Sequence, residues 1–76
     1  MIKKGFFIEL DFVPRSDEEI CLGVAKYCGK NNYSYDFLRR TSPIIAIIDG
    51  SKYEIVKKYQ HVRSMNCWVL KCREID

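Results

Sequence analysis

The chain has 76 residues, 47% of them hydrophobic and 30% charged, and its formal net charge is a mild +3. This length predicts one small domain over residues 1–76, and the hydrophobic content excludes a disordered chain. No apolar run approaches the roughly 20 residues that a membrane-spanning helix needs, so no membrane association is expected.

The first predicted element is a strand over residues 5–12. Its apolar side chains alternate onto one face: Phe6, Ile8, Leu10 and Phe12. The other face carries Glu9 and Asp11, with Phe7 as an apolar exception. The two acids also interrupt the apolar stretch after the N-terminal lysines, and no small-residue cleavage site follows. We therefore expect no signal peptide and a cytoplasmic location.

A helix is predicted over residues 16–28. Ser16 and Glu19 have the spacing of a capping box, in which the serine hydroxyl accepts from the amide of Glu19 and the carboxylate reaches back. Gly23, in mid-helix, indicates close approach to the sheet or to a partner, and Gly29 or the next residue is expected to end the helix. One apolar stripe recurs at helical spacing: Ile20, Cys21, Val24, Tyr27 and Cys28.

The centre of the chain is a run of five apolar residues, Ile44–Ile48, followed by Asp49 and Gly50. A run without alternation is typical of a strand that is buried on both faces. The Asp-Gly pair favours a tight hairpin, because both residues tolerate positive φ. This strand is therefore expected to lie in the middle of a sheet.

Three further strands are predicted, over residues 33–38, 51–59 and 67–74, with residues 60–66 as a polar connection. The assignment of residues 51–59 has an alternative. Tyr53, Val56 and Tyr59 also recur at helical spacing, so a second helix is the other interpretation of this segment.

The predicted fold is α+β, with one helix packed on a five-stranded mixed, mostly antiparallel sheet in the order β-α-β-β-β-β. The strand–helix–strand start predicts a right-handed crossover with the first two strands parallel. The short links after it predict the sheet order 1-2-3-4-5. In this sheet we expect Ile45 or Ile47 to face the helix, and Ile44 and Ile48 to lie on the opposite face.

No catalytic, cofactor-binding or metal site is predicted. Cys21 and Cys28 are about 10.5 Å apart along a helix, too far for a disulfide, and neither they nor Cys67 and Cys72 have zinc-knuckle spacing. All four are expected to be reduced thiols that act as small hydrophobic residues. No sequence feature brings His61 to a cysteine, and no phosphate-binding loop or hydrolase motif occurs, so an enzyme is not expected.

The favoured function is protein binding or self-assembly. One helix about 20 Å long cannot cover five strands, and only one face of the sheet has a helix. An open apolar face marks an interface, and a second copy of the chain, forming a homodimer, is its expected cover, with another protein as the other candidate. The residues expected on this interface are Phe7, Ile44, Ile48, Val56 and Val69.

The alternative function is single-stranded nucleic-acid binding by the more basic C-terminal half, where aromatic residues are interleaved with lysines and arginines. No stretch matches the signature of an RNA-recognition sheet. The candidate anion-binding residues are Arg39, Arg40, Lys57, Lys58 and Arg63.

The layout IIDGSKYEIV followed by NCWVLKCREI resembles a family of short bacterial domains of unknown function. The most specific part is the closing W-x3-C-x-E, here Trp68, Cys72 and Glu74. The resemblance implies a small α+β fold. Because that family has no assigned activity, it assigns no functional residue to this chain.

Overall fold

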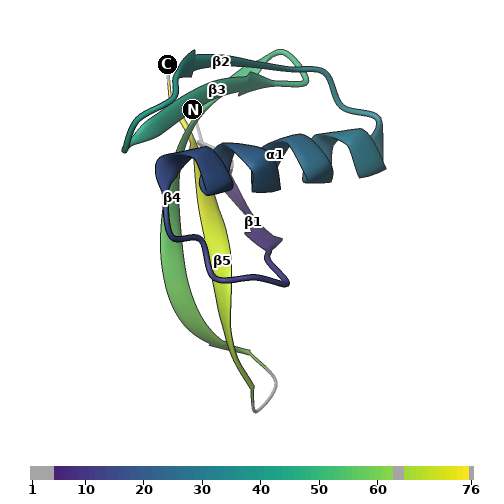
Figure 1. Cartoon of the computed structure of the whole chain (residues 1–76). Coiled ribbons are helices and arrows are strands. Elements are labelled where there is room, and N and C mark those ends of the chain that lie inside the picture. The colour runs from purple at the N-terminus through teal and green to yellow at the C-terminus, as the bar shows by residue number, and fades with distance from the viewer. Residues whose placement is uncertain (1–4, 63–64, 76) are drawn as a thin grey trace.

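The computed structural model describes residues 5–62 and 65–75. It consists of one helix and a five-stranded sheet, which confirms the α+β class (Figure 1). The elements, in chain order, are β1 (Gly5–Glu9), α1 (Asp17–Asn31), β2 (Tyr35–Arg39), β3 (Ile44–Ile48), β4 (Ser51–Val62) and β5 (Met65–Glu74). Among the described residues, no helix is long and apolar enough to cross a membrane.

The strand order in the sheet is β1-β5-β4-β3-β2, and every neighbouring pair is antiparallel. The predicted mixed sheet and the order 1-2-3-4-5 are therefore wrong. β1 and β2 run in the same direction, as a crossover through a helix requires, but they form the two opposite edges of the sheet. The strand that pairs with β1 is β5, the last in the chain, and β4 rather than the isoleucine-rich β3 takes the middle position.

Ser16 caps α1: its Oγ accepts from the amide of Glu19 at 3.2 Å. The carboxylate of Glu19 accepts from the amide of Arg15 at 2.7 Å, one residue earlier than a capping box predicts. The helix runs past Gly29 and Lys30, where the sequence predicted its end, to Asn31, and Asn32 caps it with a φ of 58°. Asparagine tolerates this left-handed conformation better than most residues, which explains the later end.

Gly23 lies on the side of α1 that packs against Leu10 and, in β5, Leu70. A Cβ atom at this position would lie 2.9 Å from Cδ2 of Leu10 and 3.4 Å from Cδ1 of Leu70. A side chain here would therefore have to displace neighbours in the core. This close approach confirms the prediction that the mid-helix glycine allows close contact with the sheet.

The core lies between α1 and one face of the sheet (Figure 1). Ile44, Ala46 and Ile48 of β3 face the helix and are almost fully buried. The prediction that Ile45 or Ile47 faces the helix, with Ile44 and Ile48 opposite, is therefore wrong. The sequence has apolar residues on both faces of this strand, so alternation could not distinguish them.

Side-chain size explains why Ile44, Ala46 and Ile48 face the helix. The evidence is a row of three paired residues across β2, β3 and β4. Ala46 pairs with Phe37 on one side and with Tyr53 on the other, and both rings pack against the core. A small residue between two aromatic ones leaves room for both rings beneath the helix. If the register shifted by one residue, isoleucine side chains would occupy that space.

The β4–β5 hairpin is longer than predicted. β4 extends to Val62 and β5 begins at Met65, so the second-helix interpretation and the polar connection over residues 60–66 are both wrong. β3 pairs with β4 only as far as Ile55. Beyond that point, residues 56–62 and their partners 65–71 form what we call the arm, which extends beyond α1 in Figure 1.

Candidate functional site

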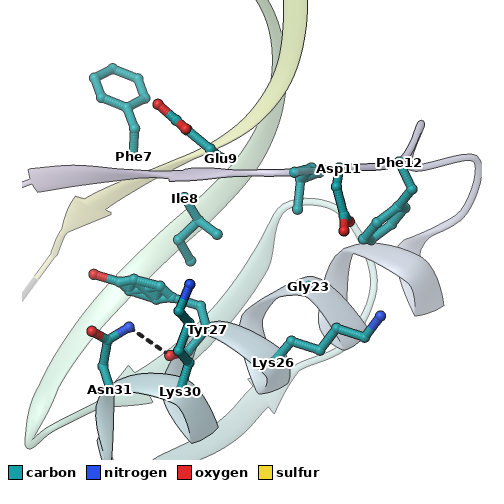
Figure 2. A pocket seen from close by; sticks show the side chains of 11 residues that line it. Phe7, Ile8, Glu9, Asp11, Phe12, Gly23, Lys26, Tyr27, Lys30 and Asn31 are labelled. Carbon is teal, nitrogen blue, oxygen red and sulfur yellow. Dashed lines mark hydrogen bonds between the residues drawn. The ribbon is translucent and has the colours of Figure 1, made fainter.

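The face of the sheet opposite α1 is covered by no helix in the described part of the chain. Phe7 and Glu9 of β1 point away from the helix, while Ile8 between them points toward Tyr27 (Figure 2). The strand registers continue this face across the sheet. We call it the open face; its members are Phe7, Glu9, Ile45, Ile47, Glu54, Val56, Lys58, Val69, Lys71 and Arg73.

Two apolar side chains stand on the open face on either side of a lysine. Phe7, Lys71 and Val56 are direct cross-strand partners in one row over β1, β5 and β4. Phe7 is 49% exposed and Val56 39%. Ile45 and Ile47 are half-buried and extend the apolar surface onto β3.

The structure distributes the five predicted interface residues over both faces. It places Phe7, Val56 and Val69 on the open face, although Val69 is only 1% exposed between its neighbours Glu9 and Lys58. Ile44 and Ile48 lie under the helix and are unavailable to a partner. Ile45 and Ile47 take their place, and the sequence analysis missed them because it assigned β3 to the wrong faces.

Charges of both signs are mixed on the open face. Arg73 Nη2 and Glu54 Oε1 form a salt bridge of 2.8 Å between β5 and β4. These two residues, together with Val56 and Lys71, line a shallow hollow of about 110 Å³. The surface is thus neither uniformly basic nor uniformly apolar.

The five predicted anion-binding residues are not brought together. Arg39 donates to the carbonyl oxygens of Thr41 and Ser42, and the guanidinium of Arg40 lies 4.8 Å from the centre of the Phe37 ring. The remaining three are also separate. Lys57 and Lys58 point to opposite sides of the arm by the pleat of β4, and Arg63 lies outside the described residues.

A groove of about 560 Å³ runs between the free edge of β1 and α1 (Figure 2). The Asp11 side chain, from the segment after β1, points toward the groove, which Lys26 and Lys30 of the helix also line, whereas the Glu9 side chain points away from it (Figure 2). Asn31 Nδ2 donates to the carbonyl of Tyr27 at 2.8 Å, where the groove ends beside the last turn of α1. The carboxylates of Glu9 and Asp11 thus lie on opposite sides of this segment and do not form a pair.

The buried cysteines belong to the core. Burial raises the pKa of the thiols of Cys21 and Cys28, and burial, with a smaller effect of Cys28, raises the pKa of Cys72 to about 12. A thiol with a raised pKa carries little of the thiolate that acts as nucleophile or metal ligand. No group of three or more metal-binding side chains occurs within residues 5–62 and 65–75.

His61 and Cys67 do not form a catalytic pair. His61 Nδ1 lies 2.8 Å from Oδ1 of Asn66, its cross-strand partner in the arm. Cys67 is the next residue along β5, so the pleat directs it to the opposite side of the arm. The imidazole is therefore not placed to activate this thiol.

No protein-family model matches the chain, and no curated protein or solved structure matches it either. The resemblance to short bacterial domains of unknown function therefore stays a prediction. The class that the fold defines is a small α+β domain with one covered and one open sheet face.

Proposed function

We propose that this protein is a self-assembly module whose open face packs against the open face of a second copy. The observation that carries the proposal is the row Phe7–Lys71–Val56, in which two exposed apolar side chains flank a lysine on a face without a helix. Large apolar side chains that are exposed together on one face of a small domain are typical of an interface. A chain of 76 residues also has a small core, which association reinforces.

The mixed charge of the open face favours a second copy over a nucleic acid. In a two-fold dimer the same surface meets itself, so each basic residue needs an acidic one within the same face. Glu9 offers such a partner to Lys58 or Lys71 of the second copy, while Glu54 already pairs with Arg73 within its own face. A protein surface that binds nucleic acid would instead carry mainly positive charge.

The test is sedimentation equilibrium of the full chain at tens of micromolar, in low and in high salt. We expect a dimer that persists or strengthens at high salt, because apolar burial does not depend on ion pairing. Val56→Glu should weaken association about a hundredfold, since it buries an unpaired carboxylate in the interface. The matched control is Leu22→Glu, which changes a 49% exposed leucine on α1 and should leave association unchanged.

A chain that stays monomeric at every salt concentration would overturn the proposal. So would a dimer that Val56→Glu leaves intact, because the interface would then lie elsewhere. Circular dichroism on each variant checks that the fold is retained.

A further inference from the structure

The side of the arm that faces away from the open face carries a row of polar and aromatic side chains. The pleat and the register of β4 and β5 place them on the same side as the core residues Ile55 and Leu70. We call this surface the inner side of the arm; its members are Lys57, Tyr59, His61, Asn66 and Trp68.

Two aromatic rings form the centre of the inner side. Tyr59 and Trp68 are direct cross-strand partners, with ring centroids 5.1 Å apart and ring planes at 55°. Such a pair stabilises a two-stranded hairpin. However, Tyr59 remains 56% exposed, so much of its ring is open to solvent.

A cation lies beside this pair. Lys57 Nζ lies 5.8 Å from the centre of the Trp68 ring and donates to the carbonyl of Pro14 at 3.4 Å. The second contact holds the ammonium group near the rings, at the point where the segment between β1 and α1 meets the arm.

The arm itself contains no acidic residue. Residues 55–73 include no Asp or Glu, and the nearest acidic residues along the chain are Glu54 and Glu74. Of the three lysines in this segment, Lys57 lies on the inner side, whereas Lys58 and Lys71 lie on the open face. A phosphate that approaches the inner side therefore meets Lys57 without repulsion from carboxylates on the arm itself; the acidic residue that interacts with Lys57 is Asp17, on α1.

We propose that the inner side of the arm binds single-stranded nucleic acid. An unpaired base stacks on the exposed face of Tyr59 next to Trp68, and an adjacent phosphate contacts Lys57. Aromatic side chains on an open strand surface stack on bases of any sequence, while lysines attract the backbone. The paired bases of a duplex do not offer their faces, so the site discriminates against double strands.

Trp68 is the single tryptophan of the chain, so its emission reports directly on this site. We would titrate the protein with a labelled oligothymidylate of about 12 nucleotides, a length within the site sizes of single-strand-binding domains. We expect quenching of Trp68 and an affinity that falls with salt. One phosphate contact, to Lys57, gives a slope near −0.7 in a plot of log K against log salt concentration.

Three variants separate stacking from simple attraction. Tyr59→Leu should weaken binding about tenfold or more, because it removes the stacking ring, while Tyr59→Phe should bind as the unchanged protein does. Lys57→Gln should flatten the salt slope by about 0.7. Tyr35→Leu, which changes a 44% exposed tyrosine on β2, is the matched control and should have no effect.

Equal binding of a duplex of the same length, or of polyglutamate, would overturn the proposal, since the arm would then be an unspecific cationic surface. Unchanged binding by Tyr59→Leu would also overturn it. Thermal unfolding of Tyr59→Leu and Tyr59→Phe shows whether loss of the Tyr59–Trp68 contact has weakened the hairpin itself. The inner side and the open face lie on opposite sides of the sheet, so this result is independent of self-association, which Val56→Glu tests.

Discussion

Asp17, the first residue of α1, accepts two hydrogen bonds from Ser42 in the loop between β2 and β3. One comes from the backbone amide at 3.2 Å and the other from the hydroxyl. The two residues are far apart in the chain, so this contact ties the start of the helix to the far edge of the sheet. The hydroxyl and then the amide of Ser42 lower the pKa of Asp17 below its ordinary value of 3.8.

This contact predicts a loss of stability in acid. Because the pKa of Asp17 is lower in the folded chain than in the unfolded chain, its contribution is fully present above the unfolded value. It disappears as the pH falls through the folded value. Between pH 6 and pH 3, the melting temperature of Asp17→Asn should therefore fall less than that of the unchanged protein.

The measurement is thermal unfolding followed by circular dichroism across this pH range. Glu18→Gln is the matched control, because it removes one negative charge from the same helical turn without touching the contact to Ser42. Ser42→Ala should raise the pKa of Asp17 toward 3.8, as the carboxyl resonance in an NMR titration would show. Equal acid sensitivity of Asp17→Asn and the unchanged protein would contradict the prediction.

Truncation of an isoleucine side chain in β3 should lower the free energy of unfolding by different amounts on the two faces of the strand. Ile44 is fully buried under α1, whereas Ile47 is half-buried on the open face. Ile44→Ala should cost about 2–5 kcal/mol of unfolding free energy, enough to unfold a marginal domain, because it leaves a cavity in the core. Ile47→Ala should cost less than Ile44→Ala in the monomer. Urea unfolding of both variants at low protein concentration compares the two costs, and a larger cost at Ile47 would contradict the face assignment.

Local structure could be predicted from the sequence wherever the type of a residue itself favours the conformation that it adopts. Ser16 marks the start of α1, and Asp49 and Gly50, with φ values of 51° and 87°, form the turn between β3 and β4. Strand order has no such local signal. The pairing of β1 with β5 depends on contacts between residues such as Ile8 and Leu70, far apart in the sequence.

The candidate site was predictable only in part, for the same reason. Phe7 departs from the alternation of its own strand, and that departure identifies an apolar residue on the open face. Ile45 and Ile47 give no such signal, because their neighbours in β3 are equally apolar. The arm was missed because its outer end is polar, but the absence of acidic residues from 55–73 is a sequence signal that could have drawn attention to it.

The four cysteines should differ sharply in reactivity in the folded protein. Cys21, Cys28 and Cys72 are buried in the core, and burial raises the pKa of each thiol, that of Cys72 to about 12. At pH 8 these three thiols are protonated and shielded from reagents. Cys67 is half-buried on the arm and accessible. We therefore expect a disulfide reagent such as dithionitrobenzoate to modify Cys67 rapidly in the native state, and all four thiols only after unfolding.

Counting the released thionitrobenzoate in native and denatured protein measures this difference. Cys67→Ser should abolish the rapid phase, and it serves as the control that assigns the phase to one residue. Between pH 7 and pH 9 the modification of Cys72 in the folded protein should stay slow, because a thiol with a pKa of about 12 remains almost entirely protonated throughout that range. Rapid modification of more than one thiol in the folded protein would contradict the prediction. At least one core cysteine would then be exposed to solvent, which requires that α1 separates from the sheet.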